Sequence, residues 1–417
     1  MVYELKTPTE RYKGVLIFRG LESDYLRNPG PELSKALRAV RKYYVVGVHW
    51  GRYQHHVPEF KHVDFHMAAP GTIEEFGPDS WRWIPLCSRD FTPGYFRPLD
   101  VPNRWDLVTV ANINPEKNLD ELLEIIRLCY DAGRPLSVFL LCPYASEETR
   151  DQFRRTVRRT FTERERRNFE VVTPNKRVTV ENGIPNTLLP YLYNSSRLFA
   201  LLSEEEGGGR VVSESLLCGT PVVVKDTLRG GAADYLTEKN SFGVSSVEEG
   251  AAQIRETLAN PDRYQFDPEP LRSTLVEDHS VTLLESELQR VFQMAGCEYG
   301  GPIDTESLAW KLPSHYPSIP KQFRSDPGKS VLRSHRLVHD FLWYKVDQVE
   351  RGAPISRRYA GKKVWLHQDV GPTLRDEFVS PLKQTTATGL QSIEHETGVP
   401  AFQTAKRLYN YVFPGQD

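Results

Sequence analysis

The sequence predicts an α/β protein with a doubly wound, parallel-sheet domain in the middle of the chain. Its 417 residues are enough for two or three domains, each with its own core. Between residues 107 and 225, apolar runs of strand length alternate with amphipathic runs of helix length. Strands that are apolar along their whole length are typical of a parallel sheet covered by helices on both faces.

The first third of the chain predicts a small domain over residues 1–100, including a linker. A helix is expected over 31–42, where Leu33, Leu37 and Val40 fall on one face. The run from 84 to 102 has four prolines and no periodicity, which indicates an interdomain linker. The expected strands, rich in β-branched and aromatic residues, are 13–18, 43–50, 61–69 and 81–86.

Residues 101–297 predict the doubly wound domain itself. Apolar strands and amphipathic helices alternate here with short turns between them. The expected strands are 107–113, 135–142, 169–173, 198–202 and 220–225, and the expected helices are 118–133, 186–196, 210–219, 246–259 and 280–295.

Residues 298–417 form a separate extension in which the pattern changes. Its first part is rich in proline and turn residues, and helices are expected near 330–350 and 400–412. From residue 300 onward there are 16 Lys and Arg against 12 Asp and Glu, so the extension is mildly basic.

The composition favours a soluble, cytoplasmic enzyme. The formal charge of -2 excludes a basic field over the whole sequence, although a local basic patch remains compatible with it. No apolar run approaches the length of a membrane-spanning helix, and the first residues lack the apolar core of a signal peptide. The five cysteines are widely spaced and predict buried thiols rather than a disulfide framework or a zinc site.

A glycine-rich turn after the strand 198–202 is the strongest candidate for a functional site. The backbone N–H groups of Gly207, Gly208 and Gly209 precede a helix, and such an arrangement binds anions. Glu206 lies on the loop and Glu214 on the following helix, so we expect different roles for the two carboxylates. A carboxylate accepts hydrogen bonds from sugar hydroxyls or from a ribose diol. Glu204 and Glu205 are alternative acids on the same loop.

This segment resembles the E-x7-E signature of retaining GT-B glycosyltransferases (glycosyl transferases group 1, family 4-like). The resemblance extends from the linker at 84–96, through the strand and loop at 108–126, to about residue 295. One departure is that the family's Gly-Arg pair is replaced by Ala111 and Asn112, whereas the lysine five residues further on is kept as Lys117.

The resemblance implies two Rossmann-like domains facing a cleft, with the C-terminal extension packing back on the N-terminal domain. Glu206 would then lie beside the donor sugar, Gly207 to Gly209 would cradle the sugar and diphosphate, and Glu214 would hold the ribose. Lys117 would bind the diphosphate, Asn112 would lie at the donor, and Arg210 or Lys225 would supply the missing cation. His49 ends an apolar strand of the N-terminal domain, where the family often keeps a histidine near the sugar, and the acceptor side is expected in that domain.

The activity implied is sugar transfer from a nucleotide diphosphate sugar to an acceptor hydroxyl, retaining and independent of metal and cofactor. Two other functions remain open: a non-catalytic relative that binds a nucleotide sugar or a partner, and a nucleotide-sugar epimerase. The acceptor is open between a glycan, a lipid-linked molecule and nucleic acid, including modified DNA bases. Eight arginines over residues 150–170 are typical of a solvated helix face, or of a patch for an anionic acceptor.

Overall fold

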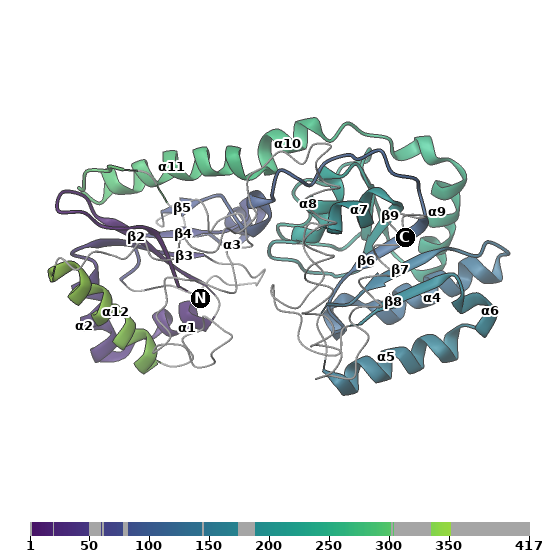
Figure 1. Ribbon diagram of the computed structural model, residues 1–417, viewed down its shortest axis with the longest axis horizontal. Helices are drawn as coiled ribbons and strands as arrows, with labels where there is room; N and C mark the ends of the chain where they lie inside the picture. The colour runs from purple at the N-terminus through teal and green to yellow at the C-terminus, as the bar shows by residue number, and fades with distance from the viewer. Residues whose placement is uncertain are drawn as a thin grey trace, which may run out of the picture.

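A computed structural model of the chain contains two α/β units, and the chain crosses between them near residues 87–92 and again near residue 277 (Figure 1). The structure describes residues 2–19, 21–49, 60, 62–77, 82–143, 146–173, 188–301, 303 and 335–351. Most of the extension predicted at 298–417, including the helix expected at 400–412, lies outside the described residues.

The first unit is built on a five-stranded sheet in which the strands follow one another in chain order. Four strands are parallel, and the first pairs antiparallel with the second at one edge. The strands are β1 (Val2–Lys6), β2 (Gly14–Arg19), β3 (Tyr44–His49), β4 (Phe65–Met67) and β5 (Trp83–Ile84). The helices are α1 (Leu21–Arg27), α2 (Gly30–Val40) and α3 (Pro70–Phe76).

The second unit has a six-stranded parallel sheet with the strand order β11-β10-β9-β6-β7-β8. Counted from its own first strand, this is the 3-2-1-4-5-6 order of a Rossmann fold, so the predicted doubly wound fold is confirmed. The strands are β6 (Trp105–Val110), β7 (Val138–Leu141), β8 (Phe169–Val172), β9 (Ser196–Leu201), β10 (Val222–Lys225) and β11 (Ser241–Val244).

Helices cover both faces of the second sheet because successive side chains of its strands point to opposite sides. One core contains Leu107 and Leu140 with α4 (Leu119–Asp131), α5 (Glu147–Thr160) and α9 (Val247–Ala259). The other contains Val108 and Leu141 with α7 (Leu189–Asn194) and α8 (Arg210–Leu217). The described part of the unit also contains shorter elements, among them α6 (Glu163–Arg166), η4 (Pro261–Tyr264) and α10 (Glu269–Leu275).

Helix α11 (Glu277–Met294) follows the second unit in sequence but packs on the first. Its side chains Leu284, Leu288, Val291 and Phe292 are fully buried in the core of the N-terminal sheet. In Figure 1, α11 lies along one face of that sheet, whereas α2 lies on the other. Right-handed crossovers that all advance in one direction place their helices on one face, so a helix from elsewhere must cover the second. The sequence pattern predicts a second domain over residues 101–297, but the structure places this helix in the core of the first unit.

Helix α12 (His335–Glu350) also packs on the first unit, beside α2. Its apolar residues Val338, Phe341 and Leu342 are buried in the same core. The Lys345 ammonium forms a buried ion pair with Glu4, whose other oxygen accepts a hydrogen bond from the Tyr44 hydroxyl at 2.7 Å. The described part of the extension therefore completes the small N-terminal unit.

The segment predicted to be a linker does cross between the units, but it is a buried element rather than an open connection. Ile84 belongs to β5, and residues 88–91 form the 3-10 helix η1 (Ser88–Phe91). Residues 87–92 are all buried because this turn packs against α8, α10 and α11.

Candidate functional site

The loops that follow β6 and β9 meet at the point where the strand order of the second sheet reverses. These two strands are neighbours although β7, β8 and the helices α4 to α7 lie between them in the chain. Ligands of open α/β sheets bind at the carboxyl ends of the strands at this switch point, because the connections diverge there and leave a crevice. The predicted residues Asn112 and Lys117 follow β6, and Glu206 to Gly209 follow β9.

Lys117 is held by a tight turn at the end of the β6 loop. It closes the 3-10 helix η2 (Pro115–Lys117), and the next residue, Asn118, adopts a left-handed conformation with φ of 46°. The Asn118 amide Nδ2 donates to the Leu202 carbonyl at 2.9 Å. This bond fixes the β6 loop to the end of β9 and brings Lys117 to the loop that carries Glu206.

Lys117 and Glu206 form an ion pair across the switch point. Their side chains are 17% and 15% exposed, so both remain reachable from solvent. The Ser203 hydroxyl donates to the same carboxylate oxygen of Glu206 at 2.8 Å. The structure therefore brings together two of the predicted residues that are 89 positions apart.

The three glycines connect Glu206 to α8. Gly209 is the N-cap of α8 with φ of 32°, a left-handed conformation that favours glycine. A Cβ on Gly209 would lie 2.2 Å from the Ala232 Cβ, and one on Gly208 would lie 2.6 Å from the Ser88 hydroxyl. Only glycine therefore fits at position 209, and the N-terminus of α8 follows directly with the positive end of the helix dipole.

Glu214 lies one turn into α8 and is fully buried. Its Oε1 is 3.0 Å from the Nε of Arg210, and its Oε2 accepts a hydrogen bond from the Tyr193 hydroxyl at 3.2 Å. Burial, followed by the nearby Glu214 charge, raises the pKa of Tyr193, so its hydroxyl stays protonated and donates. Glu214 and Arg210 thus hold each other inside the domain, and neither side chain is exposed.

The remaining predicted residues of the second unit lie at the rim of the site. Asn112 is exposed on the β6 loop. Lys225, at the end of β10, pairs with Glu121 at 2.8 Å and with Glu204 at 3.3 Å. The hydrogen bond to Glu121, opposed by partial burial, raises the pKa of Lys225. Lys225 is therefore a cation already neutralised by two acids, and Glu204 faces it rather than Lys117.

His49 lies at the carboxyl end of β3 in the first unit and is completely buried. Burial, with a smaller contribution from Arg19, holds its pKa well below the usual value, so the imidazole is neutral. Neither ring nitrogen has a hydrogen-bond partner among the described residues. The neighbouring strand β4 is followed by Ala69. The Cβ of Ala69 lies 2.8 Å from the position that a Cβ on Gly231 would take, so the carboxyl edge of the first sheet meets the second unit.

An interdomain cluster around Arg89 was missed by the sequence reasoning. The Arg89 side chain is 1% exposed; its Nη2 donates to Asp234 at 2.6 Å, and its guanidinium stacks on the Tyr235 ring at 4.3 Å. Tyr235 donates to Asp90 at 3.1 Å. The signal was a charged pair, Arg89 and Asp90, between apolar Cys87 and Phe91, which is unusual for a solvated linker.

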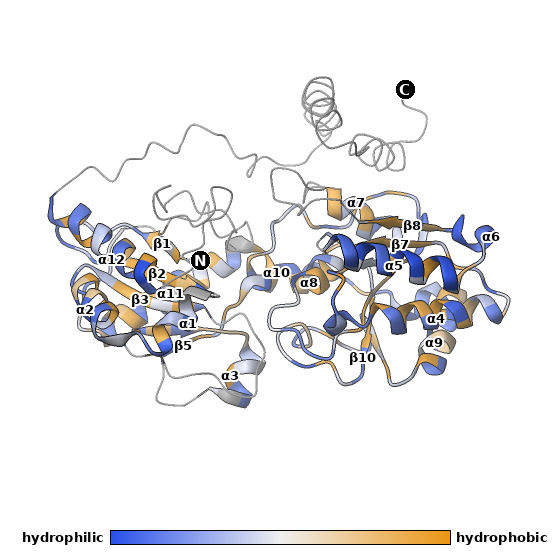
Figure 2. Ribbon diagram, turned by 90° about the horizontal axis from the view of Figure 1, so that it is seen from below, coloured by the Kyte–Doolittle hydropathy of each residue, from blue (hydrophilic) through white to orange (hydrophobic). Residues whose placement is uncertain are grey.

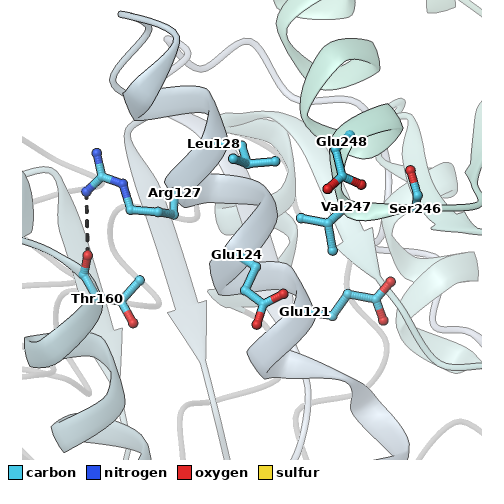
Figure 3. A pocket seen from close by; sticks show the side chains of 8 residues that line it. All are labelled: Glu121, Glu124, Arg127, Leu128, Thr160, Ser246, Val247 and Glu248. Atoms are coloured by element: carbon cyan, nitrogen blue, oxygen red, sulfur yellow. Dashed lines mark hydrogen bonds between the residues drawn. The ribbon is translucent and has the colours of Figure 1, made fainter.

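An open pocket of about 520 Å³ lies elsewhere on the second unit, between α4 and the start of α9 (Figure 3). Glu121, Glu124 and Glu248 line it, and Arg127 points away to the Thr160 carbonyl and to Glu165. Three carboxylates repel a diphosphate. The switch point, with its lysine and its helix N-terminus, is therefore the better site for an anionic ligand.

In the part of the chain that the structure describes, no group of three or more His, Cys, Asp or Glu side chains is placed to hold a metal ion. Within the same residues, no helix is both long enough and apolar enough to cross a membrane.

The Rossmann strand order, with a lysine and a helix N-terminus at its switch point, is typical of α/β proteins that bind nucleotides. Residues 96–267, about two fifths of the chain, match the family model of the glycosyl transferases group 1. This match lies almost entirely in the second unit, and it agrees with the predicted enzyme class, a glycosyltransferase. A comparison with curated proteins found no match.

Several solved structures are weakly similar to this chain. A TarM mutant from S. aureus, in complex with fondaparinux, α-GlcNAc-glycerol and UDP, is 14% identical over 60% of this chain and 51% of its own, with a TM-score of 0.45. Sucrose-phosphate synthase from Thermosynechococcus elongatus is 15% identical over 67% of this chain and 74% of its own, with a TM-score of 0.47. HepE from Anabaena, in complex with UDP and glucose, is 15% identical over 63% of this chain and 75% of its own, with a TM-score of 0.46. The chain spans about half the length of TarM, and the fold assignment rests on the sheet topology above.

Proposed function

We propose that the protein transfers a sugar from a nucleotide diphosphate sugar to an acceptor hydroxyl, with retention of the anomeric configuration and without a metal ion. The observation that carries the proposal is the Lys117–Glu206 pair beside the glycine loop at the switch point. It supplies a cation for a diphosphate and a carboxylate for sugar hydroxyls at one place, in a domain that matches a glycosyltransferase family.

Donor binding would redistribute the charges of this pair. Without a ligand, the Lys117 ammonium is neutralised by Glu206. A diphosphate next to the N-terminus of α8 offers Lys117 more negative charge than one carboxylate does, so Lys117 would turn to it. The Glu206 carboxylate is then released to accept hydrogen bonds from the sugar. Lys117 and the N–H groups of the glycine loop would stabilise the charge that develops on the leaving diphosphate.

The other predicted roles stay predictions. Glu214 is fully buried against Arg210 and Tyr193, so one of these side chains would have to move before a ribose hydroxyl could reach the carboxylate. His49 lies at the edge of the first unit that meets the second, which is the side where the acceptor is expected. Asn112 is exposed at the rim and carries no charge to replace the family's arginine.

The proposal is tested by calorimetric titration with UDP, GDP and ADP, and with their sugars, in buffer with EDTA, followed by assays of sugar release and transfer. We expect one nucleotide series to bind and its sugar to be transferred with retention, as read by NMR of the product. Binding of no member would overturn the proposal. Binding without transfer or release across a panel of acceptors would favour a non-catalytic relative, and interconversion of the free donor would favour an epimerase. Turnover that stops in EDTA and returns with magnesium would contradict metal independence.

Two variants separate the roles of the ion pair. Lys117→Met should weaken binding of the nucleoside diphosphate by about 10- to 100-fold, the scale of a lost hydrogen bond between charged groups, about 1.5–3 kcal/mol. Lys239 is an exposed lysine two residues before β11, and Lys239→Met removes the same charge, so this control variant should leave binding unchanged. Glu206→Gln frees Lys117, so it should bind the nucleoside diphosphate at least as tightly as the wild type but lose transfer. Weaker diphosphate binding by Glu206→Gln would contradict the charge redistribution.

A further inference from the structure

The second unit carries a cluster of exposed arginines that the donor site does not use. They lie on the last two turns of α5 and on the α6 segment that follows (Figure 2). All five are exposed, and none forms an ion pair or a side-chain hydrogen bond with another described residue. We call this cluster the arginine surface: Arg155, Arg158, Arg159, Arg164 and Arg167.

The structure keeps these charges outside while the helix is anchored by its apolar side. Phe153 and Val157 are buried in the core of the second unit, on the side of α5 opposite to the arginines. The acids of α5 are at its other end, at Glu147, Glu148 and Asp151, so positive charge is concentrated at the C-terminal half. Arg158 and Arg159 complement the helix dipole there, but this does not explain Arg164 or Arg167, which lie beyond the helix.

The arginine surface is separate from the donor site. Helix α5 begins after β7, at the carboxyl edge of the sheet, and runs back towards the start of β8 at the amino edge. In Figure 1 its far end and α6 point away from the first unit. The arginines therefore lie at the end of the domain opposite to the switch point, and they cannot contact a donor bound there.

We propose that the arginine surface binds the phosphate backbone of a nucleic acid. The guanidinium group binds phosphate oxygens through two parallel hydrogen bonds, and all eight basic residues between 150 and 170 are arginine. A membrane surface fits less well, because interfacial helices insert apolar side chains next to their basic ones. The apolar side chains of α5 are buried in the core, and in the described residues Met294, on α11, is the exposed large hydrophobic side chain.

The measurement is the affinity for a fluorescent random-sequence DNA duplex between 50 and 200 mM salt. Each phosphate contact contributes about -0.9 to the slope of log K against log salt, so five arginines contribute about -4.5, a fall of about 500-fold over this range. A variant with Arg155, Arg158 and Arg159 changed to Gln should lose about 2.7 from the slope, so its affinity should fall about 40-fold less than that of the wild type. Other contacts of the chain add equally to both proteins.

Matched variants separate this surface from general charge. Changing the same three residues to Lys keeps the charge and should keep the slope. The control removes three exposed arginines that lie elsewhere and are paired with acids, and it should leave the slope unchanged: Arg263→Gln, Arg290→Gln and Arg351→Gln. All variants are compared at equal circular dichroism signal and unfolding midpoint.

Three results would overturn the proposal. One is the absence of duplex binding by the wild type at 50 mM salt. Another is an equal loss of slope in the control variant. The third is that the wild type binds vesicles with 30% phosphatidylserine but not the duplex, and that vesicle binding depends on the three arginines. This result would indicate a membrane-binding surface instead. The test uses no sugar donor, so its outcome is independent of the proposed transferase activity.

Discussion

Replacing Gly209 with alanine perturbs the glycine loop at its most restricted point. Gly209 has φ of 32°, and an alanine Cβ would lie 2.2 Å from the Ala232 Cβ and 2.8 Å from its Cα. A left-handed conformation costs a residue with a Cβ about 1–2 kcal/mol. Forcing an extra methyl group into a packed contact costs about 1–3 kcal/mol more. We therefore expect Gly209→Ala to lower the free energy of unfolding by about 2–5 kcal/mol.

The chain offers a control that isolates the steric part of this cost. Gly133 also has a positive φ, of 79°, but no atom lies within 4 Å of where its Cβ would be. Gly133→Ala should therefore cost only the conformational part, about 1–2 kcal/mol. The assay is urea unfolding of both variants, followed by circular dichroism and tryptophan fluorescence. Adding Ala232→Gly to Gly209→Ala should recover part of the difference, because it removes the nearer of the two contacts. Equal costs for the two single variants would refute the steric reasoning.

Three further variants test other parts of the structure by urea unfolding. Lys345→Met should lower the free energy of unfolding by about 3–5 kcal/mol, because it leaves the buried carboxylate of Glu4 without its cation. Adding Glu4→Gln should recover part of this loss, and no recovery would argue against the ion pair. Burial lowers the pKa of His66 to about 4, below the 6.5 of the unfolded chain, so stability is lost as the pH falls from 6.5 towards 4. His66→Phe should therefore lose about 2.5 kcal/mol less than the wild type between pH 7.5 and 4.5, and equal losses would contradict this sign. Arg89→Lys should cost about 1–3 kcal/mol, because an ammonium cannot bond Asp234 and stack on a ring as the guanidinium does; an unchanged midpoint would exclude a role in joining the units.

Periodicity predicted most of the regular elements, because burial on one or both faces imposes a repeat that is visible in sequence. Every strand expected from 13–18 to 220–225 has a counterpart in the structure. Two strands at sheet edges were missed, β1 and β11. They have few neighbours and short apolar runs, so pairing with β2 and β10, rather than their own pattern, determines them.

The linker prediction shows where composition misleads. Prolines between 84 and 102 indicated an open connection, and prolines do interrupt regular structure there. The structure buries residues 87–92 because two domains and the start of α11 close around them. The charge of Arg89 is tolerated in that position because Asp90 and Asp234, 145 positions from Arg89, lie beside it.

The sequence by itself determined the doubly wound domain and the loop in which Glu206, three glycines and Glu214 follow one another. These features are local, because strand, turn and helix are read from neighbouring residues. The tertiary structure alone decided that Lys117 pairs with Glu206, that Arg210 forms an ion pair with Glu214, and that α11 belongs to the core of the first unit. Each of these contacts depends on which surfaces pack together when the chain folds. The pattern of neighbouring residues does not predict such contacts between distant parts of the chain.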